Sequence, residues 1–248
     1  MNKHTEQRIK RRSNNGTVIQ LSTPIVFFGN IKKSRIATLG INPSKNEFLD
    51  KGIELTGNSR RFETLTSLGA TDLELLNDSQ VEKVVESCLS YFNNNPYRKW
   101  FDQLQNFILN NFSVSYYLET ACHLDIVQWA TDPIWRDLDY FTKSELIQND
   151  IKFLKEQLLH EQIEVLLING REASNLFQNY FKPILLKHER LVVKNKTCDM
   201  YFSELELGNR TLKIFSWSNN LQSSIGITNE MRKEIGYWIK EKSIANII

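Results

Sequence analysis

A short apolar run that stops at an Asn-Pro step is the feature that most constrains the fold of this chain. Residues 35–44 read RIATLGINPS. The short apolar run 36–41 is typical of a strand buried on both faces, as in a parallel sheet. Asn42-Pro43 directly after it forces a turn. Open α/β sheets bind ligands at the carboxyl ends of their strands, so Asn42 is predicted to lie at the mouth of a site, with a side-chain carbonyl able to hold a water. Alternatively, the Asn-Pro step only ends a strand.

Strand and helix patterns alternate along the rest of the chain. Further strands are predicted at 115–127 in part, 165–168 and 212–215, with weaker peripheral hairpin strands at 191–193 and 200–207. Helices are predicted at 61–68, 72–92, 97–110, 143–159, 172–181 and 229–242. Strands that alternate with helices indicate a parallel sheet covered on both faces. The predicted fold class is therefore α/β, as a three-layer α/β/α domain whose central sheet has about four parallel strands.

The length and composition of the chain fit one globular domain. With 248 residues it is long enough to bury a sizeable core. Residues 1–16 are polar and partly basic and are predicted to form a flexible basic arm, which leaves 17–248 as a single α/β/α domain. No apolar run approaches the roughly 20 residues of a membrane span, and the first residues lack the apolar core of a secretory leader. We therefore expect a cytoplasmic, monomeric protein that does not associate with membranes.

Cysteine spacing and charge restrict the possible cofactors and partners. Cys88, Cys122 and Cys198 are far apart and fit neither a disulfide framework nor a zinc or iron–sulfur site, so no metal and no cofactor is expected. The net charge of +2 indicates no global attraction to a polyanion. Arg60 and Arg61, however, follow the Asn-Pro turn. They belong either to a moderate phosphate-binding surface or to an ordinary solvated face.

Two later strand ends also carry polar groups. In residues 121–129, ACHLDIVQW, Asp125 sits in an apolar run, where a carboxylate is costly unless it is paired or used. It either pairs with a buried arginine, caps a loop or serves a site. His123 in the same run is more readily interpreted as a structural histidine than as a catalyst. Residues 165–173, VLLINGREA, form a normal strand-turn-helix junction and are interpreted as architecture.

The segment after the last central strand is suited to contact nucleic acid. Residues 217–224, WSNNLQSS, place small hydrogen-bonding side chains around Leu221. Backbone N–H groups, serines and asparagines in such a loop suit a phosphate backbone. A lone leucine between polar residues suits a wedge pushed between stacked bases. The alternative is an ordinary polar loop with its leucine turned inward.

The order and spacing of these motifs resemble the uracil-DNA glycosylase superfamily. Gly40-Ile41-Asn42-Pro43-Ser44 is similar to the first motif of its mismatch-specific thymine/uracil branch. Residues 168–173 resemble the strand-turn-helix that follows the middle of that fold, and residues 217–223 take the place of its last motif. The resemblance spans roughly residues 35–240. It implies a cofactor-free, monofunctional DNA glycosylase that flips a nucleotide out of DNA and hydrolyses its glycosidic bond.

The resemblance also implies roles for individual residues. Asn42 would position the hydrolytic water, and Leu221 would fill the gap left by the flipped base. The base would be bordered by Gly40, Ile41 and His123 and by one stacking aromatic residue from Phe48, Phe62, Tyr97 and Trp100. The DNA would be contacted by Ser44, Arg60, Arg61, Ser218, Asn219, Asn220, Gln222 and Ser223.

Two departures from the family pattern bear on the target base. Trp217-Ser218 stands where the last motif usually opens with His or Asn followed by Pro-Ser, so an imidazole that would stabilise the leaving base is missing. Asp125 stands where the family carries a base-reading asparagine. An amide can pair with uracil, whereas a carboxylate can accept from the N4 amino group of cytosine. If protonated, Asp125 could also donate to N3. Asp125 is therefore predicted to be catalytic and to read a cytosine-type base.

A modified cytosine in foreign DNA is the target that fits these observations, because an enzyme that removed ordinary cytosine would destroy its host's genome. This resembles antiviral members of the superfamily that excise glucosylated hydroxymethylcytosine from phage DNA. Three alternatives stay open. The chain could be a repair glycosylase for uracil or mismatched thymine, a non-catalytic DNA-binding member of the fold, or an α/β enzyme acting on free nucleotides.

Overall fold

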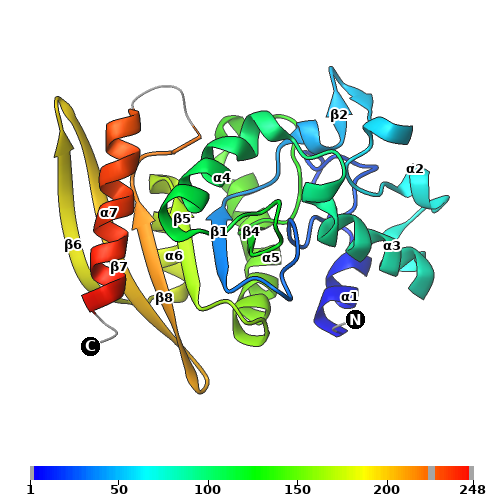
Figure 1. Cartoon of the computed structure of the whole chain (residues 1–248). Coiled ribbons are helices and arrows are strands. Elements are labelled where there is room, and N and C mark those ends of the chain that lie inside the picture. Colours follow the sequence, from blue (N-terminus) through cyan, green and yellow to red (C-terminus); the bar gives the residue numbers. More distant parts are fainter. Residues whose placement is uncertain (1–2, 223–226, 246–248) are drawn as a thin grey trace.

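The computed structural model describes residues 3–222 and 227–245 (Figure 1). Its strands are β1 (Ile36–Gly40), β2 (Leu49–Asp50), β3 (Ile53–Glu54), β4 (Ala121–Asp125), β5 (Val165–Asn169), β6 (Ile184–Val193), β7 (Lys196–Leu207) and β8 (Arg210–Trp217). Its α-helices are α1 (Lys3–Lys10), α2 (Leu65–Leu68), α3 (Asp78–Leu89), α4 (Arg98–Phe112), α5 (Tyr140–His160), α6 (Arg171–Phe181) and α7 (Asn229–Ala245).

One six-stranded sheet forms the centre, in the order β4-β1-β5-β8-β7-β6. The first four strands are parallel, which confirms the prediction of about four central parallel strands. Every residue of β4 is buried, including the polar His123 and Asp125. β7 and β6 continue the same sheet in antiparallel pairing. The two predicted hairpin strands are therefore longer than expected and belong to the central sheet.

Helices cover both faces of this sheet. In Figure 1, α4 and α7 lie in front of the strands and α5 and α6 lie behind them. α4 shows why a helix forms there, because Phe101, Leu104, Phe107 and Ile108 recur at helical spacing and are all buried. The mixed α/β architecture agrees with the predicted fold class. Among the described helices none is both long enough and apolar enough to cross a lipid bilayer.

The strand order creates a switch point between β1 and β5. The chain leaves β1 towards β4 on one side and leaves β5 towards β8 on the other. Loops that diverge from neighbouring carboxyl ends leave a crevice, which is where open α/β sheets bind ligands. Asn42 follows β1 by two residues and Gly170 follows β5 directly. The fold thus places the Asn-Pro turn at the switch point.

The N-terminal segment corrects the prediction of a flexible arm over residues 1–16. Residues Lys3–Lys10 form α1, in which Arg8 and Ile9 are buried. The Arg8 guanidinium donates to Asp150 Oδ2 at 2.9 Å and to Gln128 Oε1 at 3.1 Å. A buried, paired arginine is costly to release, so α1 is part of the packed fold. The packing of α1 cannot be predicted from local composition, because the partner of Arg8, Asp150, lies 142 residues away.

Candidate functional site

Asn42 is held in one orientation at the switch point. Its Nδ2 donates to the backbone oxygen of Trp129 and to Oγ1 of Thr131, both at 3.2 Å. A backbone carbonyl can only accept, so the amide nitrogen must be the atom that faces Trp129. Within the part of the chain that the structure describes, no donor contacts the Asn42 Oδ1. Asn42 therefore offers an oriented carbonyl oxygen, the group expected to hold a water.

Backbone pairing beyond the strand ends explains this placement. The N–H of Ile126 donates to the Gly40 oxygen at 3.3 Å, and the N–H of Val127 donates to the Ile41 oxygen at 2.8 Å. The segments that follow β1 and β4 therefore run side by side. As a result, Trp129 is brought within reach of the Asn42 side chain.

Asn42 lines a pocket of about 220 Å³. The other walls come from the Asn-Pro turn, the first turn of α4 and the segment after β4. The lining residues besides Asn42 are Pro43, Ser44, Lys45, Trp100, Thr131, Ile134, Trp135 and Arg136. The two tryptophans supply apolar walls, and Lys45 and Arg136 supply positive charge. Lys45 is paired with Asp132 at 2.9 Å. Aromatic walls, one oriented amide and nearby cations suit a flat polar ligand attached to a phosphate.

Of the four aromatic residues predicted to stack on a base, Trp100 is the one that lines this pocket. Phe48 and Phe62 are buried, with ring centroids 5.9 Å apart, and Phe62 stacks on Tyr91 at 4.8 Å. Tyr97 lies beneath the guanidinium of Arg61. The structure thus corrects the base-binding prediction for Phe48 and Phe62, which belong to an interior aromatic cluster.

Gly40, His123 and Asp125 lie together at the ends of β1 and β4. Gly40 is the register partner of Asp125, and a Cβ on Gly40 would approach the Asp125 Oδ1 to 2.5 Å. A larger residue at this position would have to displace the buried Asp125 carboxylate. His123 Nε2 lies 3.4 Å from Asp125 Oδ1, and its Nδ1 lies 2.7 Å from Thr38 Oγ1. The buried partner of Asp125 is thus a histidine, not an arginine. Asp125 is 5% exposed and lies outside the pocket that Asn42 lines.

A second buried carboxyl group, Glu47, was missed by the sequence analysis. The Tyr91 hydroxyl lies 2.9 and 2.8 Å from its two carboxyl oxygens. Burial raises the pKa of Glu47 to about 8, and the negative charge of Asp125 acts in the same direction. The Tyr91 hydrogen bond and the charge of Arg61 lower the pKa but do not offset burial. A glutamate directly before Phe48 and soon after the Asn-Pro turn is the signal that would have found it.

Glu47 makes the stability of the fold depend on pH. The ordinary glutamate pKa is 4.5, and the folded value is about 8. Below the lower value both states hold the proton, and the neutral carboxyl contributes fully to stability. As the pH rises from there to about 8, the unfolded chain loses this proton first, so the free energy of unfolding falls.

Glu47→Gln is expected to remove this fall, because an amide does not ionise. The free energy of unfolding of the variant should exceed that of the parent chain by an amount that grows with pH. The total growth should be on the order of a few kcal/mol. Urea unfolding at several pH values measures the difference. Glu82→Gln, at an exposed position of α3, is the matched control. A parent chain and Glu47→Gln variant with parallel pH profiles would show that folding does not raise the pKa of the Glu47 carboxyl.

Asn169, at the end of β5, organises the loop that follows β8. Its Oδ1 accepts from the Trp217 indole at 2.9 Å and from the Leu221 backbone N–H at 2.8 Å. Its Nδ2 donates to Asn220 Oδ1 and to Gln222 Oε1, both at 3.0 Å. The junction interpreted as architecture thus holds the loop predicted to contact DNA.

The prediction of Leu221 as an exposed wedge is wrong. Its side chain is fully buried, and its backbone oxygen accepts from Arg232 at 3.0 Å. A leucine anchored in this way cannot enter a base stack without leaving the core. The inward-turned alternative is the one the structure shows.

The polar residues of this loop mostly bind their neighbours. The Ser218 hydroxyl accepts from the Asp199 N–H at 2.9 Å, and Asn219 Nδ2 donates to the Thr197 oxygen at 3.2 Å. Gln222 Nε2 donates to the backbone oxygen of Trp100 at 2.9 Å. The loop therefore supports the pocket wall at the start of α4. Ser223, also predicted to bind DNA, lies outside the described residues.

Arg60 and Arg61 line a separate polar hollow of about 520 Å³ beside α3. Arg60 pairs with Glu63 at 3.1 Å, and Arg61 Nε donates to the Asn95 backbone oxygen at 3.0 Å. Ser44 accepts from the backbone N–H two residues on and so caps the Asn-Pro turn. The structure brings Ser44 to the pocket of Asn42 and places the two arginines elsewhere.

A cationic groove of about 530 Å³ runs between α4 and α7, and we call it the α4–α7 groove. Its lining consists of Gln103, Asn106, Phe107, Asn110, Asn111, Asn229, Arg232, Lys233, Tyr237 and Lys240. These are five amides, three cations and two aromatic residues, without a carboxylate. Arg232 Nε is buried and has no hydrogen-bond partner among the described residues, and burial lowers the pKa of this guanidinium. Such a lining attracts anions.

Comparison with protein-family models and with curated proteins gives no match. The choice among possible functions therefore depends on the chemistry of the site. Its parts are an oriented amide oxygen at a switch point, a tryptophan-walled pocket and a cationic groove that, like the pocket, is lined by α4.

Proposed function

We propose that this chain is a monofunctional DNA glycosylase of the uracil-DNA glycosylase superfamily, acting as a cytoplasmic monomer without a cofactor. The observation that carries the proposal is the Asn42 amide, whose nitrogen is bound by Trp129 and Thr131 while its oxygen is left to the pocket. An oxygen held in this way can accept from a water and aim its lone pair at one carbon atom of a bound nucleotide.

The reaction requires few catalytic groups of such a site. As the glycosidic bond of a flipped nucleotide loosens, positive charge builds on the sugar and the base departs with the electron pair. A water held by Asn42 then bonds to C1′ and releases a proton, which leaves an abasic site. Positioning and electrostatics suffice for this reaction, and no covalent intermediate forms with the protein.

The surroundings of the pocket support DNA as the substrate. Trp100 forms a wall beside Asn42, and the cations Lys45 and Arg136 lie at the same pocket. The α4–α7 groove begins near this point, because Trp100 is in the first turn of α4 and Arg232 binds the backbone of Leu221. We propose that the base enters against Trp100 and that the strand continues along the groove, where amides and cations bind phosphates.

Asp125 supports a cytosine-type base as the target. Its carboxylate lies against Gly40, whose missing side chain leaves the space that the carboxylate occupies. A base that reached over Gly40 would find an acceptor for an N4 amino group. A modified cytosine of foreign DNA, such as glucosylated hydroxymethylcytosine of phage, fits this chemistry without endangering the host genome. The resulting role is antiviral defence.

A repair glycosylase for uracil or mismatched thymine is the second candidate. It is favoured by the position of Asp125, which is almost fully buried and outside the pocket of Asn42. In that case His123 and Asp125 would only support the sheet edge, and the base would be selected by the pocket alone.

Base release from a matched set of oligonucleotides tests the proposal. The set carries uracil, mismatched thymine, cytosine, hydroxymethylcytosine or glucosylated hydroxymethylcytosine, each in single and double strands, and abasic sites are read as alkali-labile breaks. We expect breaks only at a modified cytosine. Breaks only at uracil or mismatched thymine would establish the repair function. DNA binding without any break would show a non-catalytic member of the fold.

The α4–α7 groove yields a separate prediction on DNA binding. Replacing Lys233 and Lys240 with glutamine should weaken binding of DNA about equally for all sequences. It should also lower the slope of log K against log salt by about two, because two phosphate contacts are lost. Lys152 and Lys155, exposed on α5 behind the sheet, supply the control with the same charge change. Equal salt slopes for the groove and control variants would exclude the groove from the DNA path.

A further inference from the structure

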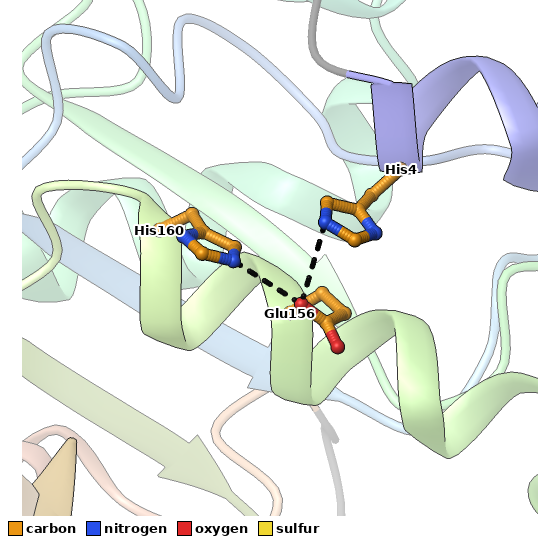
Figure 2. Close-up of side chains that lie close together, drawn as sticks. All are labelled: His4, Glu156 and His160. Carbon is orange, nitrogen blue, oxygen red and sulfur yellow. Dashed lines mark ion pairs between the residues drawn. The ribbon is translucent and has the colours of Figure 1, made fainter. Parts of the chain in front are cut away.

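Two histidines and a glutamate meet where α1 crosses α5, away from the pocket of Asn42. Figure 2 shows His4 from α1 and His160 from α5 pointing towards the carboxyl group of Glu156. Glu156 and His160 are four residues apart on α5 and so share one face of the helix. His4 completes the group from the other helix.

The distances within this group match those between ligands of one metal ion. The Nε2 atoms of His160 and His4 lie 3.2 and 3.7 Å from the same oxygen, Oε2 of Glu156. All three donor atoms lie within 4.8 Å of one another. Around a tetrahedral zinc with bonds of about 2.0–2.2 Å, neighbouring donor atoms are roughly 3.3–3.5 Å apart.

The spacing of the two imidazole rings agrees with these distances. Their centroids are 5.4 Å apart and their planes differ by 11°. Two imidazoles bound through Nε2 to one tetrahedral zinc would have centroids roughly 5 Å apart. Both side chains are about half exposed, so an ion and its water ligand can reach the site from solvent.

The geometry points to a surface site for one divalent transition-metal ion, with zinc as the ion that suits two imidazoles and one carboxylate. His4, Glu156 and His160 supply three ligands and water supplies the fourth. No metal was expected from the spacing of the cysteines, and the segment that contains His4 was interpreted as a flexible arm. Only the packing of α1 against α5 brings the three residues together.

An ion at this site would fasten α1 to the body of the protein. α1 also carries Arg8, whose guanidinium reaches Asp150 and Gln128, and Asp150 in turn accepts from the Gln128 N–H at 2.8 Å. Gln128 directly precedes Trp129, which binds the Asn42 amide. The ion would therefore stabilise α1 and, through α1, the segment behind the pocket. This inference stands apart from the proposed glycosylase function.

Zinc titration of the full chain by calorimetry, after treatment with a chelator, tests the site directly. We expect one zinc ion per chain and at least tenfold weaker binding for His160→Ala. His188→Ala is the matched control, since His188 is similarly exposed in β6 but belongs to no such trio among the described residues. Zinc binding that is unchanged in His160→Ala, or absent from the parent chain, would overturn the proposal.

Stability and proteolysis provide readouts that do not depend on enzymatic activity. Zinc at about one hundred times its Kd should raise the Tm of the parent chain by about 5 °C or more and leave that of His160→Ala nearly unchanged. Zinc should also slow tryptic cleavage after Lys10 and Arg11 in the parent chain alone. Equal protection of both proteins by zinc would show that the ion binds elsewhere.

Discussion

Asn42→Ala is expected to abolish base release while DNA binding stays within about twofold of the parent value. The variant keeps the pocket walls and the cationic groove but loses the oxygen that positions the attacking water. Losing a group that positions or activates the nucleophile reduces turnover by roughly 10²–10⁴-fold. Single-turnover rates of abasic-site formation, measured beside DNA binding on the same oligonucleotide, separate the two effects.

Asn46→Ala is the matched control for this prediction. Asn46 belongs to the same turn, but its amide donates to the Tyr97 hydroxyl at 3.2 Å and does not line the pocket. We expect this variant to keep most of the activity. If both alanine variants lose base release equally, the turn as a whole is required, and no special role falls to the Asn42 oxygen.

Asp125→Asn is expected to shift the base preference from cytosine-type to uracil-type substrates. The amide gains a donor for O4 of uracil and keeps an acceptor for N3–H, whereas the carboxylate accepts from N4 of cytosine. One well-formed pair of hydrogen bonds discriminates by about 1–3 kcal/mol, so the ratio of kcat/KM values for the two base types should change by roughly 10–100-fold. Competition between the two substrates in one reaction measures this ratio.

Asp137→Asn makes the same chemical change at a partly exposed carboxylate that faces Arg136. It should leave the base preference as it is. An unchanged ratio in Asp125→Asn, together with retained activity, would show that Asp125 only supports the sheet edge. The repair-type glycosylase would then be the better description.

The central sheet could be predicted because its strands are marked by local sequence. The strands β1 and β5 are largely apolar runs followed by Asn-Pro and Asn-Gly steps, and the middle residues of each are buried as such runs predict. The edge strand β6 was predicted only in its last residues, because Lys187, His188, Glu189 and Arg190 make its middle polar. That composition suits an exposed sheet edge.

In the candidate site, the sequence predicts the position of a residue only where that residue directly follows a recognisable strand. Asn42 lies where the Asn-Pro step predicts. Leu221 does not lie exposed as predicted. Its backbone N–H is held by the side chain of Asn169, which is 52 residues away. The same holds for Glu47, whose partner Tyr91 is 44 residues distant, and for His4, which meets its neighbours only when α1 packs on α5. Contacts of this range leave no local pattern in a single sequence.

The most direct measurement of the central claim is a count of both products from one oligonucleotide that carries a single glucosylated hydroxymethylcytosine. The parent chain should release the free modified base and form abasic sites in equal amounts, and Asn42→Ala should form neither while still binding the DNA. Binding of that oligonucleotide by the parent chain with no free base released would contradict the account.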